Sequence, residues 1–93
     1  MEKRIALIGI IVSDMTQTGK INSILSGYQE DILGRMGLPH QHHNDEELAI
    51  ISIAIEAPAD VISALSGKLG MVSGITSKVI YHTVKTQQKG ITG

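Results

Sequence analysis

One order of segments limits what this chain can fold into: strand, helix, strand, strand, helix, strand. The last part of that order is the clearest, because a helical segment ends at Gly70 and a β-type segment follows after a short turn, over Ser63–Lys78 (SALSGKLGMVSGITSK). With 93 residues, the chain has room for a single hydrophobic core. We therefore expect one domain over residues 1–84 and a polar, flexible tail over residues 85–93.

The first and third of the four predicted strands are the most apolar. Arg4–Val12 carries apolar residues on both alternating faces, as a strand covered on both sides does. Leu48–Glu56 is similar, with three isoleucines on one face. The second strand, Arg35–Pro39, contains a proline that cannot donate a backbone hydrogen bond, so we expect it at an edge. The fourth, Ser73–Val84, mixes apolar and polar residues along its length.

The first helix is predicted to start in the polar loop Ser13–Gly19, where Thr16 or Thr18 can cap its first turn. It is expected to continue to Leu33 and to end at Gly34, because apolar residues recur at helical spacings up to that point. These apolar positions are Ile21, Ile24, Leu25, Tyr28, Ile32 and Leu33.

The second helix is predicted to start near Pro58, with Asp60 in its first turn, where a negative charge complements the helix dipole. Its end is expected at Gly70, in the left-handed conformation that glycine adopts most readily. The side chains that would face the core are Val61, Ile62, Leu65 and Leu69.

These segments fit one α+β topology, the ferredoxin-like βαββαβ sandwich with an antiparallel sheet in the order 4-1-3-2. That order makes the two most apolar strands central, and right-handed crossovers place both helices on one face. The other face would still carry apolar side chains, among them Leu48, Ile50 and Ala54, and has to be covered. A second copy of the chain is the simplest cover, so we expect a homodimer or a tetramer.

The composition excludes several classes of function. A net charge of −1 favours neither nucleic acid nor an anionic membrane as a partner. The chain has no cysteine, which rules out disulfides, thiolate metal sites and a cysteine nucleophile. Its apolar start, MEKRIALIGIIV, is better explained as a strand than as a signal peptide. We expect a cytoplasmic protein and, since no nucleophile is aligned with a base, one that is not an enzyme.

The loop after the first strand is the first candidate binding site. Ser13, Asp14, Thr16, Thr18 and Gly19 offer hydroxyl groups, one carboxylate and backbone N–H groups at a helix N-terminus. Such groups can hold a small polar or anionic ligand. Ordinary helix capping is the alternative explanation of the same residues.

A histidine-rich segment is the second candidate; it lies in His40–Glu47 (HQHHNDEE), which we expect to be a polar connection between two strands. His40, His42 and His43 precede three acidic residues, and imidazole with carboxylate suits a transition metal such as Ni or Zn. In an extended segment, His40 and His42 would point to the same side, as a chelate requires. The alternative is a solvated polar loop whose histidines titrate near neutral pH.

Three segments carry a resemblance to a known family: Glu30–Pro39 (EDILGRMGLP), Leu48–Ile55 (LAIISIAI) and Ala64–Gly74 (ALSGKLGMVSG). Through them the chain resembles the ACT-like family and, more closely, the small proteins described as iron-only hydrogenase system regulators. The similarity runs from about Arg4 to Lys78. It implies a ferredoxin-like ACT fold, self-association, and a regulatory role exerted through a small-molecule effector or a partner protein.

The resemblance also bears on both candidate sites. ACT domains typically bind small effectors near the first strand–helix loop, and Asp14 and Gly19 match an acidic residue and a glycine common there. The effector half of nickel-responsive regulators is similar too, and its histidine-rich region has a counterpart in His40, His42 and His43. That family's metal site also uses a cysteine, and its proteins carry a DNA-binding segment; this chain has neither.

Overall fold

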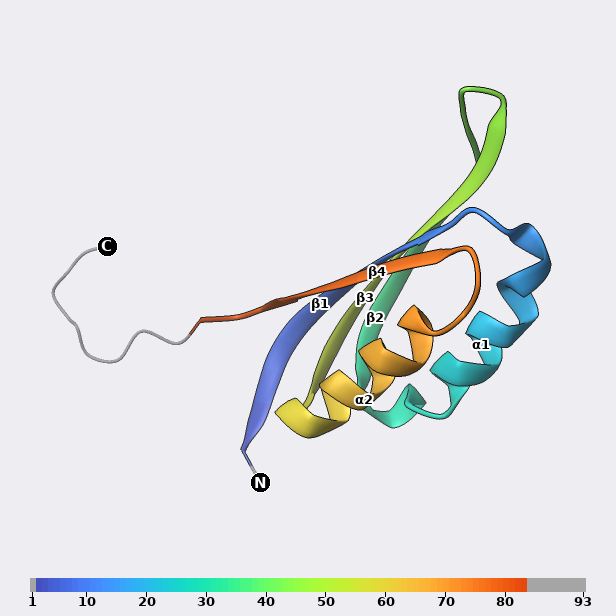
Figure 1. The fold of residues 1–93 in the computed structure, drawn as a ribbon. Coiled ribbons are helices and arrows are strands. Elements are labelled where there is room, and N and C mark those ends of the chain that lie inside the picture. Colours follow the sequence, from blue (N-terminus) through green and yellow to red (C-terminus); the bar gives the residue numbers. More distant parts are fainter. Residues whose placement is uncertain (1, 84–93) are drawn as a thin grey trace, which may run out of the picture.

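The computed structural model describes residues 2–83, which form one antiparallel sheet with two helices packed on one face (Figure 1). The elements are β1 (Lys3–Val12), α1 (Thr18–Ser26), β2 (Ile32–His43), β3 (Glu46–Pro58), α2 (Ala59–Gly70) and β4 (Ile75–Tyr81), with short 3-10 turns η1 (Met15–Gln17) and η2 (Gln29–Asp31). The strand order is β2-β3-β1-β4, which confirms the predicted ferredoxin-like α+β arrangement. The predicted tail, residues 85–93, lies outside the described residues.

The hydrophobic core lies between the helices and the two central strands. Alternate residues of β1 and β3 are buried, and Ile8 of β1 pairs directly with Ile53 of β3. From α2, Ile62, Leu65 and Leu69 enter the same core, as the helical spacing predicted, whereas Val61 is only partly buried. Burying a side chain of this size stabilises the fold by about 1.5–3 kcal/mol.

The predicted end of the first helix is wrong. Helix α1 ends at Ser26, and the chain then passes through η2 and enters β2 at Ile32. Gly27 follows the last helical residue, and glycine is a poor helix former because it loses the most backbone entropy on folding. Ile32 still packs against the core, but from a strand, and Leu33 lies at an irregularity of β2 and is exposed.

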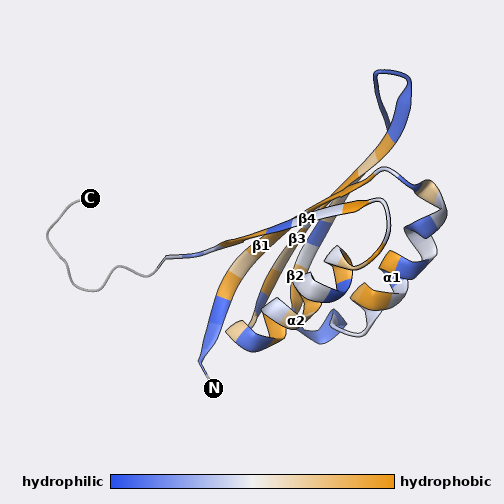
Figure 2. Cartoon of the chain, in the orientation of Figure 1, coloured by the Kyte–Doolittle hydropathy of each residue, from blue (hydrophilic) through white to orange (hydrophobic). Residues whose placement is uncertain are grey.

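The polar connection predicted over His40–Glu47 is also wrong. It forms the end of a β-hairpin that projects beyond the rest of the sheet (Figure 1) and is hydrophilic at its tip (Figure 2). Asn44 and Asp45 make the two-residue turn, with φ of 52° and 65°. A two-residue hairpin turn of this kind requires positive φ, and Asn and Asp tolerate it better than most residues. The predicted edge position of β2 is confirmed.

The left-handed cap predicted at Gly70 is wrong as well. Gly70 is the last residue of α2, and Met71 continues the chain in a right-handed conformation with φ of −85°. The glycine with positive φ is Gly74, at 76°, in the turn before β4. The left-handed residue therefore lies four positions later than the end of the helical pattern.

Candidate functional site

The loop after β1 is organised by Asp14. Its Oδ1 accepts hydrogen bonds from the Thr16 hydroxyl at 2.6 Å and from the Thr16 backbone N–H at 3.0 Å. These bonds stabilise the charged carboxylate, so they lower the pKa of Asp14 below its ordinary value. Capping of the first helix by Thr16 or Thr18 was predicted, but α1 has no side-chain cap. Asp14 caps the turn η1 that precedes it, and the Thr18 hydroxyl donates to the Met15 carbonyl.

The same loop is fixed to the turn before β4. The Ser13 N–H donates to the Gly74 carbonyl at 2.8 Å, and the Ser13 hydroxyl donates to it at 3.1 Å. A side chain at Gly74 would begin only 2.5 Å from the Asp14 Cβ, so this contact requires glycine in addition to the positive φ. Nothing local in the sequence indicates this partner, which is 61 residues away from Ser13.

The structure brings most of the predicted effector residues together. Ser13, Asp14, Thr16 and Thr18 lie in or beside η1, whereas Gly19 is already the second residue of α1. The hydroxyl groups of this set donate to acceptors within the protein. A small ligand at this loop would therefore have to exchange some of these internal hydrogen bonds for its own.

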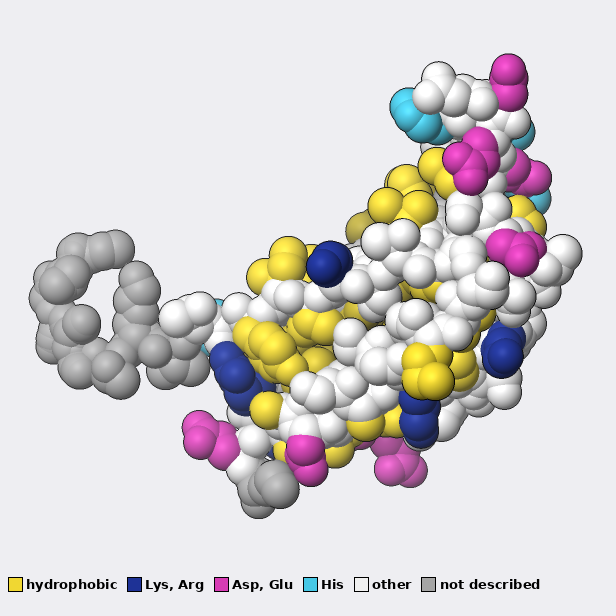
Figure 3. Space-filling model, viewed as in Figure 1, with side chains coloured by type: hydrophobic (Ala, Val, Ile, Leu, Met, Phe, Trp, Pro, Cys, Tyr) yellow, Lys and Arg dark blue, Asp and Glu magenta, His cyan; other side chains and the backbone are white. Residues whose placement is uncertain are grey.

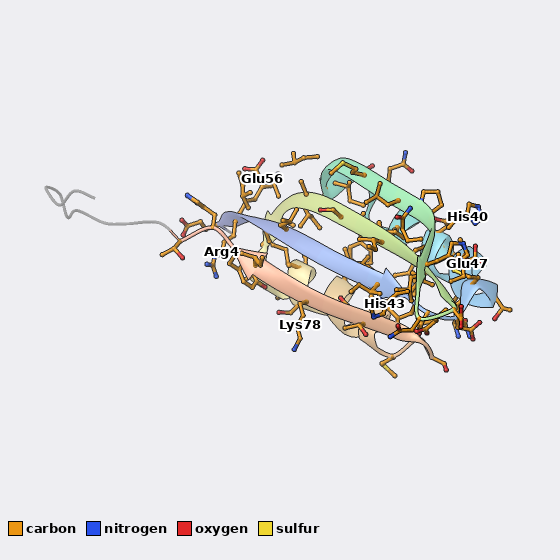
Figure 4. The ribbon with its side chains drawn as sticks, turned by 90° about the horizontal axis from the view of Figure 1, so that it is seen from above. Arg4, His40, His43, Glu47, Glu56 and Lys78 are labelled. Carbon is orange, nitrogen blue, oxygen red and sulfur yellow. The ribbon has the colours of Figure 1, made fainter. Side chains whose placement is uncertain are left out.

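The histidine-rich segment lies on the projecting hairpin (Figures 3 and 4). His40 has φ of 60° beside an irregularity in β2, and its Nδ1 lies 2.6 Å from Oε2 of Glu47. This hydrogen bond is the main cause of the lowered pKa of Glu47. His42 pairs with Glu47, and His43 with Glu46. His42 and His43 therefore project to opposite sides of the strand.

These side chains do not form a metal site within one chain. Among residues 2–83, no three His, Asp or Glu side chains are placed so that they could hold a metal ion. The contact between His40 and Glu47 nevertheless puts one imidazole and one carboxylate together at the surface. A complete coordination shell for a metal ion would need ligand atoms in addition to those of His40 and Glu47.

The face of the sheet opposite the helices, which is turned toward the viewer in Figure 4, is largely apolar. Seven large side chains there are each at least 38% exposed: Ile5, Leu7, Ile11, Met36, Leu38, Ile50 and Ile80. We call this set the free face. The strand pairings make its residues neighbours, with Leu7 between Ala54 and Ile80, and Ile11 beside Ile50. A shallow apolar hollow lies over Leu7, Ala54 and Ile80.

The free face contains one charged side chain near its middle, that of Lys78. Gly9 lies between Ser52 and Lys78 in the strand pairing, and nothing lies within 4 Å of where a side chain at Gly9 would start. Arg4 and Glu56 lie at one end of the sheet, and the hairpin residues lie at the other (Figure 4). The sequence indicated apolar residues on this face from both central strands, and Ile5, Leu7 and Ile11 of β1 are exposed there. Neither helix within residues 2–83 has the length and apolar character needed to cross a bilayer.

Comparison with known proteins gives one family. Residues 4–79 match the model of the TM1266-like family. The members of this family are described as iron-only hydrogenase system regulators, a role that has been suggested for them rather than demonstrated. The solved structure of an uncharacterized protein, TM1266 from Thermotoga maritima, is similar to this chain with 36% identity and a TM-score of 0.78. That similarity covers 88% of this chain and 100% of the other. A search of the curated proteins finds no match.

A more distant solved structure shares only the fold. It is LarC2, the C-terminal domain of a cyclometallase involved in synthesis of the NPN cofactor of lactate racemase, in its apo form. The identity is 13%, the TM-score is 0.53, and the similarity covers 87% of this chain and 57% of the other. At that identity, nothing about activity is transferred.

Proposed function

The chain belongs to the TM1266-like family, for which a regulatory role in iron-only hydrogenase systems has been suggested, and we propose that it is a non-enzymatic, ACT-like regulatory module. In this proposal, two or more copies associate through the free face. A small polar effector binds at the loop Ser13–Gly19. The bound state is transmitted through the assembly or to a partner protein.

The observation that carries this proposal is the free face itself. Seven large apolar side chains, each at least 38% exposed, lie together on one side of the sheet, and contiguous exposed apolar patches commonly mark interaction sites. The small residues Gly9, Ser52 and Ala54 lie among them, so a second free face has both protruding and recessed positions to pack into. A second copy supplies such a surface without any other protein.

The effector loop is placed where it can influence that contact. It follows directly after Val12 at the end of β1, and Ile11 belongs to the free face. Exchange of the internal hydrogen bonds of Asp14 for bonds to a ligand would alter the end of β1 and, through Ser13, the turn at Gly74. Ligand binding and association are therefore expected to be coupled.

Thermal unfolding with a panel of amino acids and small organic acids tests the effector site. A ligand of this site should raise the unfolding temperature of the wild type and of Asp60→Ala, a control that removes an exposed acid near the start of the other helix. It should have no effect on Asp14→Ala. The effector proposal fails if no compound shifts the wild type, or if the shift survives in Asp14→Ala.

Metal binding is the second candidate function, and the close pair of His40 and Glu47 favours it. His40, His42 and His43 would supply imidazole ligands for Ni or Zn, with further donors from a second copy. Calorimetric titration of Ni and Zn into the wild type and into a variant with all three histidines replaced by alanine tests this. Equal binding by the two proteins would exclude the hairpin as the metal site.

A further inference from the structure

Strand β4 has an outer edge that no strand of residues 2–83 pairs with. The strand lies at one end of the sheet order, and its register with β1 is regular along all seven of its residues. It contains no proline, and Lys78, at its centre, is its only charged residue. Of the features that commonly keep an edge strand from pairing, β4 therefore has one, a central lysine.

The hydrogen bonds at the two ends of β4 show which of its backbone groups point outward. The His82 N–H donates to the Ile5 carbonyl, and the Ser13 N–H donates to the Gly74 carbonyl, each at 2.8 Å. In an antiparallel pair, residue pairs that share hydrogen bonds alternate with pairs that do not. The even-numbered residues of β4 therefore bond to β1, and the outward N–H and C=O groups belong to Ile75, Ser77, Val79 and Tyr81.

The side chains beside this edge limit what a partner strand can carry. On the side of the free face, Lys78 extends outward from β4 (Figure 4), and the exposed Ile80 lies two residues further along the strand. On the side of the helices, the guanidinium of Arg4 lies over the Tyr81 ring, 4.3 Å from its centre. Cationic groups therefore lie on both sides of the second half of this edge.

The charge of Lys78 argues against a second copy of this chain as the occupant. Directly opposite residues of an antiparallel pair interact, and lysine is favoured opposite an acidic residue. In the part of the chain that the structure describes, β2 and β4 are the strands with a free edge, and neither contains aspartate or glutamate. A strand that complements Lys78 therefore has to come from another protein.

We propose that the outer edge of β4 binds an extended acidic segment of a partner protein, which adds a strand to the sheet. An acidic side chain of that segment lies opposite Lys78, and an apolar side chain lies opposite Ile80. This names the surface through which the module would act on a partner, so it rests on the proposed function. The edge begins directly after Gly74, whose carbonyl accepts both hydrogen bonds of Ser13, so the effector loop meets it at one end.

Amide hydrogen exchange of the full chain, followed by NMR, tests where the segment binds. The probe is a synthetic peptide of about nine alternating valine and threonine residues, with glutamate in place of the central valine. Its binding should slow exchange roughly tenfold or more at the four outward amides, and should leave Thr76, Lys78 and Ile80, which already bond to β1, unchanged. Slower exchange at every residue of β4, or at none of the outward amides, would overturn the proposal.

An exchange of charge tests the chemistry of the partner. Lys78→Glu should weaken binding of the glutamate peptide roughly threefold or more, and should favour a peptide with central lysine by a similar factor. Lys20→Glu, which changes an exposed charge on α1, is the matched control and should bind both peptides as the wild type does. Fluorescence anisotropy of labelled peptides measures all three proteins. If Lys78→Glu binds both peptides as the wild type does, no acidic residue pairs with Lys78.

Other occupants of the edge would be visible in the protein without peptide. If the outward amides are already protected and dilution removes the protection, a second copy occupies the edge. If the protection does not depend on concentration, another segment of the same chain occupies it. Either result would overturn the proposal. Association through the free face is measured separately, by mass, so the failure of one claim is distinguishable from the failure of the other.

Discussion

Gly74 shows how one residue can hold a candidate site in place. Its positive φ and its contact with Asp14 leave no room for a side chain. Gly74→Ala should therefore lower the free energy of unfolding by about 1–3 kcal/mol. Gly70→Ala is the matched control, because Gly70 is helical and has open space around it, and it should be neutral or slightly stabilising. Urea denaturation measures both, and equal losses would contradict this account of the turn.

The lowered pKa of Asp14 predicts how the stability of the fold depends on pH. Because hydrogen bonds from Thr16 lower its pKa in the folded state, Asp14 binds a proton less readily when folded than when unfolded. Its contribution to stability is thus complete above the unfolded-state value of about 3.9 and disappears as the pH falls through the folded-state pKa. NMR titration should show the Asp14 pKa rising toward its ordinary value in Thr16→Val. An unchanged pKa in that variant would show that the Thr16 hydroxyl is not the cause.

The hairpin is the element whose turn chemistry is least favourable. Asn44 and Asp45 both have positive φ, and glycine at the second position is the preferred partner of asparagine in such a turn. Asp45→Gly is expected to raise the free energy of unfolding by roughly 0.5–1 kcal/mol, whereas Asp45→Ala should lower it. Chemical denaturation, with hydrogen exchange of the hairpin amides, distinguishes the two. If both variants shift stability in the same direction, the turn does not have this conformation.

At the same scale, the central elements could be predicted from the sequence and the peripheral ones could not. The runs of β1 and β3 and the apolar stripe of α2 have one consistent period, so strand order and helix face follow from them. Tyr28, Ile32 and Leu33 continue the helical spacing of α1, although Ile32 packs against the core from a strand, and only tertiary packing decides between the two. The hairpin escaped prediction because its histidines and acidic residues favour strands weakly and its turn contains no glycine.

The candidate site was predictable in its residue types but not in its geometry. The hydroxyl and carboxylate groups of the loop could be chosen by their chemistry alone. Their fixation by Gly74 depends on a contact between distant parts of the chain, which no local pattern records. Equally, the sequence placed the three histidines close together but could not show that His42 and His43 face opposite sides of a strand.

For the molecule as a whole, the central claim is that the free face is an interface between copies. The variant Ile11→Glu would place a charge in the middle of that interface, whereas in a monomer the same side chain would remain in water. Ser63→Glu adds the same charge on the exposed side of α2 and serves as the control. The wild type, Ile11→Glu and Ser63→Glu are expected to show the same secondary structure by circular dichroism.

The most direct test is native mass spectrometry of the wild type, Ile11→Glu and Ser63→Glu at equal micromolar concentration. The account predicts a dimer or tetramer for the wild type and for Ser63→Glu, and half that number of copies or fewer for Ile11→Glu. A monomeric wild type, or an Ile11→Glu assembly of the same size as the wild type, would contradict the claim that the free face joins copies of this chain.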